Sequence, residues 1–316
     1  MIARRSLAAL LAALPAAARA QGFPERALRM LVANAPGGGM DSIARMTAGP
    51  LGQVLGQPVV VENRPGAGGT IAAESLLRSP PDGHSLLFFN LSSLALAPIT
   101  WPNLPHQQLV PAGSISRTPM VLLVHASVPA NTVAELRALI RARPNALSFA
   151  TPGNGTTPHL LALRFAQLAG GEMLHVPYQG GSQQIGDLIG GRVQVMFDTL
   201  AATVSTVQTG SVKALAITSE AGDPLLPGVP TMAQAGLPEL AFWLWNILLV
   251  PAALPPALQG RLGAALAEAL AQPELRAAFA RLGVEPKAIA AAEVARMVER
   301  EREEWGPVAR LATGRG

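Results

Sequence analysis

Three short segments rich in glycine and small polar residues are the parts of this sequence best suited to chemistry. They span residues 36–41, 63–69 and 151–159, and each follows a short apolar run and precedes a helix-like pattern. Backbone N–H groups at the start of a helix have no acceptor within the helix, so they bind anions without a cationic side chain. The segments therefore predict a cleft that holds a small anion, such as a carboxylate or a phosphate.

These segments do not match the standard phosphate-binding fingerprints. A G-x-G-x-x-G pattern that starts at Gly66 requires a third glycine where the chain has Ile71, and one that starts at Gly37 meets Ser42. No glycine-rich segment is followed by Lys-Ser or Lys-Thr, so a P-loop is absent from the sequence.

Residue patterns typical of catalysis are also missing. The chain has no cysteine, which excludes disulfides, thiol nucleophiles and cysteine-based zinc sites. It has no G-x-S-x-G elbow and no histidines at metal-ligand spacing. The histidines are His84, His106, His125, His159 and His175. We expect no catalytic residues, no metal and no other cofactor, although an enzyme whose groups converge in space stays an alternative.

Three polar residues have a structural as well as a functional interpretation. Asp41 fits a capping or first-turn position that the helix dipole favours. His159 opens a helix and suits a surface position as well as a site. Asp198 ends an apolar run, where an unpaired carboxylate is costly, so it is the more interesting candidate.

Strands alternate with helices along the chain. We expect strands over residues 28–33, 58–62, 85–90, 147–150, 193–197 and 213–218, and helices over 70–78, 133–143, 258–282 and 292–305. The charged run in the last helix is most simply a solvated face. This alternation predicts an α/β protein with open sheets in two lobes, whose ligands bind beyond the carboxyl ends of the strands.

The N-terminal segment is expected to be an export signal. Arg4 and Arg5 precede the uncharged run 6–18, and Ala18-Arg19-Ala20 provides a site for a peptidase, so we expect cleavage after Ala20. The loss of three arginines lowers the formal charge from +4 to +1. Since the remaining chain has no basic stripe interleaved with aromatic residues, nucleic acid is not an expected partner.

Eight segments in order carry a family resemblance. They are PGGGMDSIAR (36–45), LGQPVVVENRPGAGGT (55–70), PDGHSLL (81–87), GNGTTPHL (153–160), HVPYQGG (175–181), GGRVQVMFD (190–198), LPGVPT (226–231) and AGLPEL (235–240). Together they resemble the substrate-binding receptors of tripartite tricarboxylate transporters, also called Bug receptors. The resemblance covers nearly the whole chain after the expected signal.

The resemblance implies a two-lobed periplasmic binding protein of the type II kind. Each lobe is expected to be an open, mostly parallel sheet flanked by helices, with the ligand cleft between the lobes. By analogy, the chain crosses between lobes near residues 121–124 and 243–250. The first lobe then combines residues 21–120 with 246–316, and the second lobe is 121–245.

In such receptors backbone amides and ordered water hold the ligand carboxylate. The matching first-lobe residues are Gly37, Gly38, Asp41, Ser92 and Ser93. The matching second-lobe residues are Thr151, Gly155, Thr156, His159 and Asp198. Asp198 would favour a ligand that bears an ammonium or hydroxyl group and would penalise a second carboxylate.

Two departures from the family pattern flank the expected pocket. The chain has Asn34-Ala35-Pro36 where a Phe-Pro pair is usual, and Thr151-Pro152-Gly153 where serine and glycine are common. The identity of the ligand therefore does not carry over from the family, and Asn34 would add an amide contact for a polar ligand.

The expected function is that of a monomeric carrier. It captures a small organic carboxylate between closing lobes and delivers it to the membrane permease subunits of a tripartite transporter. Two alternatives stay open: a periplasmic enzyme that acts on a small carboxylate, and a receptor that signals to a sensor-kinase ectodomain.

Overall fold

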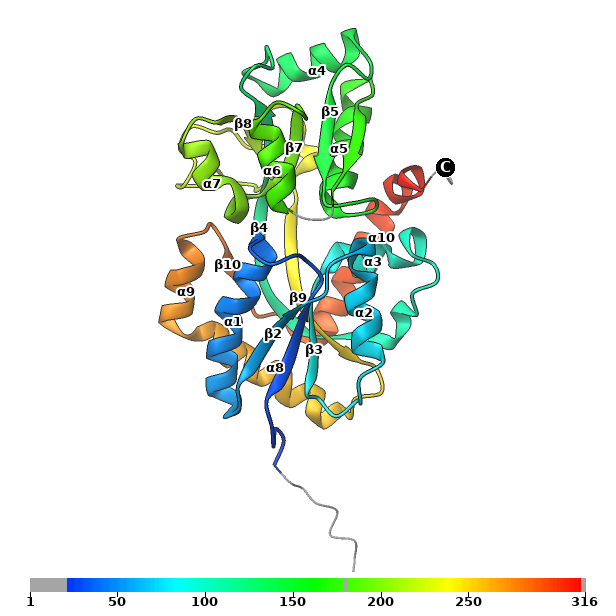
Figure 1. Ribbon diagram of the computed structural model, residues 1–316, viewed down its shortest axis with the longest axis vertical. Coiled ribbons are helices and arrows are strands. Elements are labelled where there is room, and N and C mark those ends of the chain that lie inside the picture. The colour runs from blue at the N-terminus through cyan, green and yellow to red at the C-terminus, as the bar shows by residue number, and fades with distance from the viewer. Residues whose placement is uncertain (1–21, 179–180, 314–316) are drawn as a thin grey trace, which may run out of the picture.

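The computed structural model describes residues 22–178 and 181–313. The expected export signal and its cleavage site lie outside these residues. The chain forms two lobes, one above the other in Figure 1, and long strands run from one lobe to the other. This arrangement confirms the predicted α/β, two-lobed fold.

The first lobe contains the N-terminal and C-terminal elements. They are β1 (Leu28–Val32), α1 (Gly39–Leu55), β2 (Val59–Asn63), α2 (Thr70–Leu77), β3 (Ser85–Asn90), α3 (Leu91–Thr100), β9 (Trp243–Pro251), α8 (Pro256–Ala271), α9 (Pro273–Ala280), β10 (Glu285–Pro286) and α10 (Ala291–Ala312). The strand β1 pairs in parallel with β2 and β3, whereas β9 pairs antiparallel with β3.

The second lobe is built from the middle of the chain. Its elements are α4 (Val133–Ala142), β5 (Ser148–Thr151), α5 (Thr157–Ala169), β6 (Leu174–Pro177), α6 (Gly181–Ile189), β7 (Val195–Thr199), α7 (Leu200–Gln208) and β8 (Val212–Ile217). The strand β5 pairs in parallel with β6 and β7. Each sheet thus combines parallel pairs with antiparallel pairs.

One long strand, β4 (Leu109–His125), belongs to both sheets. It pairs antiparallel with β9 as far as Pro119, opposite Trp243, and with β7 from Met120 onward, opposite Thr199. The change of partner between Pro119 and Met120 is where β4 passes from one lobe to the other. The lobe limits expected from the sequence remain a proposal.

The burial of each element follows from its sequence. All six residues of β3 are buried, as expected for an apolar strand covered on both faces. In α4, Val133, Leu136 and Ile140 face the core, and the hydroxyl of Thr132 accepts a hydrogen bond from the Glu135 amide at 3.2 Å. In α4 the apolar spacing and the capping residue together set where the helix begins.

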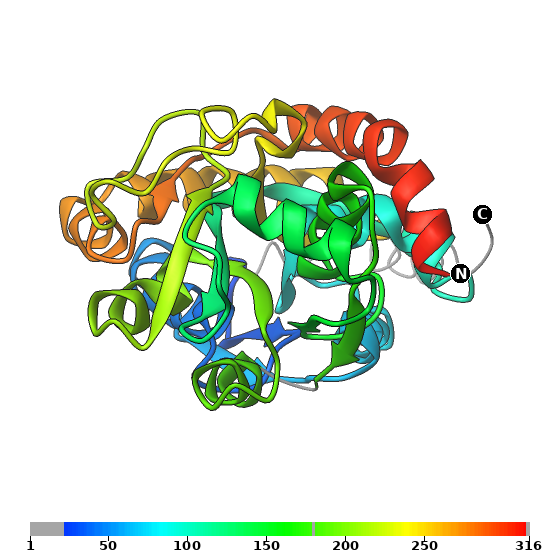
Figure 2. The same ribbon diagram turned by 90° about the horizontal axis from the view of Figure 1, so that it is seen from above.

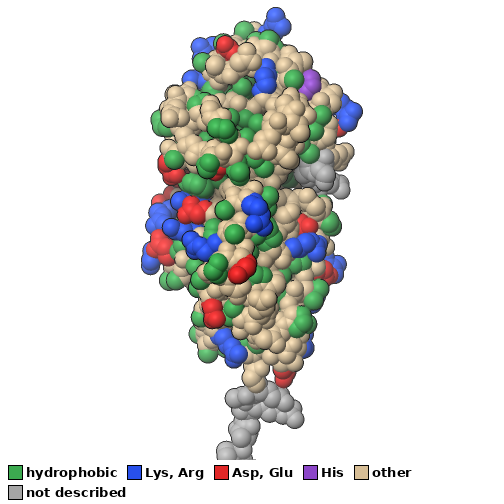
Figure 3. Space-filling view, turned by 90° about the vertical axis from the view of Figure 1, so that its left-hand side faces the viewer, with side chains coloured by type: hydrophobic (Ala, Val, Ile, Leu, Met, Phe, Trp, Pro, Cys, Tyr) green, Lys and Arg blue, Asp and Glu red, His purple; other side chains and the backbone are tan. Residues whose placement is uncertain are grey.

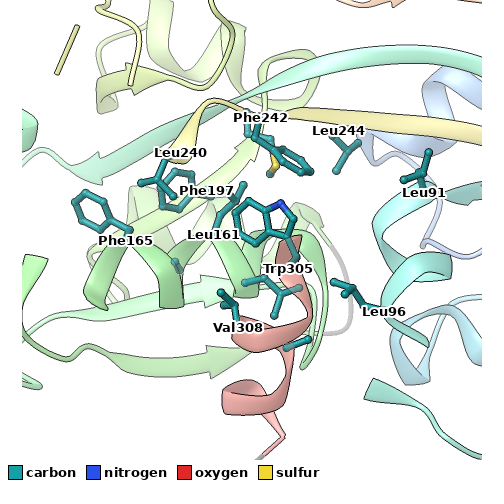
Figure 4. Packing of buried hydrophobic residues seen from close by; sticks show 14 of the residues in the cluster. Leu91, Leu96, Leu161, Phe165, Phe197, Leu240, Phe242, Leu244, Trp305 and Val308 are labelled. Carbon is teal, nitrogen blue, oxygen red and sulfur yellow. The ribbon is translucent and has the colours of Figure 1, made fainter. Parts of the chain in front are cut away.

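The C-terminal helix α10 packs against both lobes. It lies against α3 and β4 and also against α5 of the second lobe (Figures 1 and 2). Trp305 meets Phe242 edge to face, with ring centroids 5.4 Å apart, within the cluster shown in Figure 4. A buried apolar cluster therefore continues from one lobe into the other.

Two sequence expectations about the C-terminal region need correction. The single helix expected over 258–282 is wrong: Pro273 lacks an N–H, and Gln272 before it is extended, so the chain forms two helices. The charged run of α10 is only partly a solvated face. Arg302 donates to the carbonyl of Ala95, and burial raises the pKa of Glu301 to about 8.

The surface shows scattered charge. On the face in Figure 3, basic and acidic side chains lie among uncharged ones, and the described residues of this face form no broad patch of one sign. In the described part of the chain, no helix is both long enough and apolar enough to cross a bilayer.

Two glycines of α8 provide a matched test of its packing. A methyl group on Gly263 would lie 2.7 Å from the carbonyl oxygen of Ala112, which is fixed in β4, whereas Gly260 faces open space. We expect Gly263→Ala to lower the free energy of unfolding by about 1–3 kcal/mol. Gly260→Ala should raise it by up to about 1 kcal/mol. Urea denaturation of both variants checks this, and equal stabilities would contradict the packing of α8 on β4.

Candidate ligand-binding site

A cavity of about 610 Å³ lies between the lobes. Both lobes contribute to its walls. The lining residues are Ala33, Asn34, Met40, Pro65, Gly66, Ala67, Gly68, Gly69, Ile71, Phe89, Asn90, Ser93, Trp101, Pro152, Gly153, Asn154, Thr156, Thr157, Pro158, Tyr178 and Leu244. No charged side chain is present among these residues.

The start of α3 forms one end of the cavity. Asn90, the last residue of β3, caps this helix: its Oδ1 accepts hydrogen bonds from the amides of Ser92 and Ser93, at 2.9 and 3.3 Å. The same oxygen lies 3.3 Å from the hydroxyl of Thr157 on α5. One amide oxygen therefore holds the start of α3 and joins it to the second lobe.

The start of α5 faces the same cavity. Its N-cap residue, Thr156, directs its hydroxyl to the carbonyl of Gly153 at 2.7 Å and does not cap the helix. Gly155 has a φ of +72°, and a methyl group there would lie 2.7 Å from Thr100 of the first lobe. The close approach of this loop to Thr100 of α3 thus requires glycine. Because no side chain caps α5, the first-turn amides other than that of Pro158, which has no N–H, are available to a ligand.

The loop before α2 forms a third wall. Gly68 and Gly69 have positive φ, and methyl groups on them would lie 2.1 Å from the Trp101 ring and 2.7 Å from the Phe89 ring. This segment is glycine-rich in the sequence, but the sequence alone predicts no ligand contact for it. The run of glycines could have indicated a place in the site, because such runs mark close approach of other groups to the backbone.

Only some of the residues predicted from the sequence lie at the cavity surface. Ser93 and Thr156 line it, and so does Asn34, whose amide was expected to contact a polar ligand. The other predicted residues lie outside the lining. They are Gly37, Gly38, Asp41, Ser92, Thr151, Gly155, His159 and Asp198.

Asp41 organises the first glycine loop. Its carboxylate accepts hydrogen bonds from the Gly37 amide at 2.9 Å, Asn63 at 2.8 Å and Arg45 at 3.0 Å. Burial opposes ionisation, but these hydrogen bonds, with that from Arg45 first, keep the pKa of Asp41 below its ordinary value. An ionised Asp41 whose oxygens are already occupied acts on the shape of the loop.

His159 has a similar role in the second-lobe loop. Its Nδ1 accepts a hydrogen bond from the Gly155 amide at 3.0 Å, and its ring stacks on His175 with centroids 4.0 Å apart. Burial, with the neighbouring His175, lowers the pKa of His159 to about 3, so the ring is neutral at neutral pH. The Thr151 hydroxyl lies 2.6 Å from Nε2 of His175 and so belongs to the same network.

Asp198 is held at the end of β7. Its carboxylate accepts hydrogen bonds from the Thr199 amide at 2.7 Å and from Gln184 at 3.1 Å. Burial raises the pKa of Asp198 to about 6, so a large share of it is ionised at neutral pH. Within residues 22–178 and 181–313, no cluster of His, Asp and Glu side chains has the arrangement of a metal site.

Residues 43–312 match the family described as the tripartite tricarboxylate transporter family receptor. The chain belongs to this family. The receptor is 36% identical over 293 residues to a protein of the tcbD–tcbE intergenic region of a Pseudomonas species, covering 92% of this chain and 87% of that one. It is 32% identical to the protein BugT of Bordetella pertussis, over 95% of this chain and 93% of that one.

Solved structures support the same assignment. The periplasmic binding protein BugD matches the receptor with a TM-score of 0.85 at 30% identity, over 92% of this chain and 99% of that one. MatC of Rhodopseudomonas palustris with bound malate has a TM-score of 0.85 at 30% identity, over 91% and 100% of the two chains. Another R. palustris protein, solved with adipate, has a TM-score of 0.86 at 30% identity, over 92% and 98%. The receptor thus has the fold of periplasmic solute-binding proteins.

The neutral His159 makes a testable contribution to stability. The folded receptor resists protonation of this ring between pH 6.5 and about 3, whereas the unfolded chain takes up the proton, so stability falls as the pH drops through this range. The His159→Asn variant lacks the titrating ring. Between pH 6.5 and 4.5 we expect its free energy of unfolding to fall by about 2 kcal/mol less than that of the wild type. Urea denaturation at the two pH values measures the difference. An unchanged loss would show that His159 does not titrate in this way.

Proposed function

We propose that the receptor binds a small organic carboxylate between its lobes in the periplasm and delivers it to the membrane permease subunits of a tripartite tricarboxylate transporter. The observation that carries this proposal is the meeting of two helix starts, those of α3 and α5, at one cavity without charged lining residues. The start of α5, which no side chain caps, stabilises an anion through backbone amides, and Ser93 at the start of α3 would add a hydroxyl from the other lobe. The relatives solved with malate and adipate support the same class of ligand.

Direct contacts are proposed for residues that line the cavity. Ser93 and Asn90 would reach the ligand from the first lobe, and Thr156 with first-turn amides of α5 from the second. The remaining predicted residues would act through the loops that they hold. Asp41 shapes the segment around Gly37 and Gly38, and His159 with Thr151 shapes the segment around Gly155.

Capture depends on closure of the two lobes. A ligand that touches both helix starts gains its full set of contacts only when the lobes are together, so it favours the closed state. The hydrogen bond between Thr157 and Asn90 would add to this preference, since it crosses the cavity between the lobes. On this proposal the chain is exported, cleaved after Ala20 and acts as a monomer.

A thermal-shift screen of the exported protein tests the proposal. The panel contains mono-, di- and tricarboxylates, amino acids and aromatic acids. A ligand at about 100 times its Kd should add about 2.7 kcal/mol to the free energy of unfolding. Silence across the whole panel would contradict carboxylate binding, and conversion of the bound compound to a product would favour an enzyme.

The contact between lobes gives a second prediction. Thr157→Val keeps the shape of the side chain but removes the hydroxyl that donates to Asn90, so the closed state should become less favourable. We expect affinity for the best ligand of the panel to fall about threefold to tenfold, in line with one lost hydrogen bond. Thr157→Ser is the matched control, because it keeps the hydroxyl and should retain most of the affinity. Titration calorimetry compares the three proteins, and equal affinities of the valine variant and the wild type would exclude this role.

A further inference from the structure

The cavity walls away from the helix starts are apolar and partly aromatic. They include Met40, Ile71, Phe89, Trp101 and Leu244. From these walls we propose that the ligand is a monocarboxylate with an aromatic body, which the receptor prefers to flexible dicarboxylates. This inference rests on the proposed function and adds the class of carboxylate.

Trp101 provides a fixed ring surface. The ring lies against the backbone of Gly68, so close that a methyl group on that glycine would be 2.1 Å from the ring carbon Cζ2. Trp101 also follows directly on α3, where its amide donates to the carbonyl of Ala97 at 2.8 Å. A ring held at both backbone and side chain offers a flat apolar surface without a further cost in side-chain entropy.

Tyr178 also contributes its ring and not its hydroxyl. The hydroxyl donates to Oδ2 of Asp187 at 2.7 Å, and Arg192 donates to the other oxygen of the same carboxylate at 2.7 Å. Since the hydroxyl is already engaged outside the lining, the part of Tyr178 that is left for a ligand is the aromatic ring.

The apolar side chain of Ile71 is partly exposed to solvent. It lines the cavity at the start of α2, yet 43% of its surface is exposed. Phe89, another lining residue, is only 1% exposed. Because apolar surface gains free energy when water leaves it, a ligand with an apolar body would cover Ile71 favourably.

The apolar walls favour a ligand with a single carboxylate. Ser93, Asn90 and the amides of α5 lie at the helix starts, and the other polar side chains of the lining, such as Asn34 and Asn154, are uncharged. The lining residues include no lysine, arginine or histidine. A second carboxylate directed at the apolar walls would lose its water without gaining a partner, which is costly.

Titration calorimetry with a small matched set of acids tests this inference. The probes are benzoate, 2-naphthoate, adipate, malate and the neutral amide benzamide. We expect benzoate or 2-naphthoate to bind at least tenfold more tightly than adipate and malate, and benzamide at least tenfold more weakly than benzoate. Tighter binding of adipate or malate would overturn the aromatic class but leave carboxylate binding intact. Binding of none of these acids would overturn the aromatic class, and silence of the whole thermal-shift panel as well would overturn the proposed function. Benzamide as tight as benzoate would overturn the role of the carboxylate.

A pair of isoleucine variants separates the loss of a ligand contact from a general loss of protein stability. Ile71 and Ile189 are both 43% exposed, but only Ile71 lines the cavity, whereas Ile189 ends α6. We expect Ile71→Ala to weaken the tighter-binding aromatic acid about fivefold, because it removes apolar surface that the ligand covers. Ile189→Ala should leave that affinity unchanged. Equal effects of the two substitutions would contradict a ligand body that rests on this wall.

Discussion

Backbone amides at the start of a buried helix must find an acceptor, and this constraint governs the centre of the molecule. At α3 the protein supplies the acceptor through Asn90. At α5 it does not, because the Thr156 hydroxyl turns back to Gly153. The cavity between the lobes is therefore asymmetric: one helix start is closed by a side chain that also reaches across to Thr157, and the other is left for a ligand.

The rest of the fold holds these two helix starts at the required separation. Asn90 stands at the end of β3, which pairs with β9, and β9 in turn pairs with β4. The strand β4 continues into the second sheet and pairs there with β7. The helix α10 adds apolar contacts to α3 and α5, the two helices that open on the cavity. Continuous strands and a shared apolar cluster thus connect the two lobes.

The sequence was a good guide to the elements and a weaker guide to the site. Alternating apolar runs and glycine segments predicted the strand over 85–90 to the residue, and Thr70 as the start of α2. Pro273 marks the break between α8 and α9, where the apolar spacing alone predicts a single helix. At the site, the order of apolar runs and glycine segments predicts where the loops are, but it does not predict which way their side chains point. The carboxylate of Asp41 and the ring of His159 are taken up within their own loops. Trp101 and Leu244 reach the cavity from elements far apart in the chain, which no local pattern reveals.

The division between a backbone anchor and a side-chain wall has an evolutionary consequence. Amides of the main chain are supplied by every residue except proline, so the part that holds the carboxylate tolerates substitution as long as the helix start keeps its position. The wall includes side chains such as Ile71 and Trp101, which belong to segments other than α5. A scaffold of this kind can acquire new ligands through a few point mutations while it still requires a negatively charged group on the ligand. Relatives with the same fold can therefore differ in ligand specificity before they differ in structure.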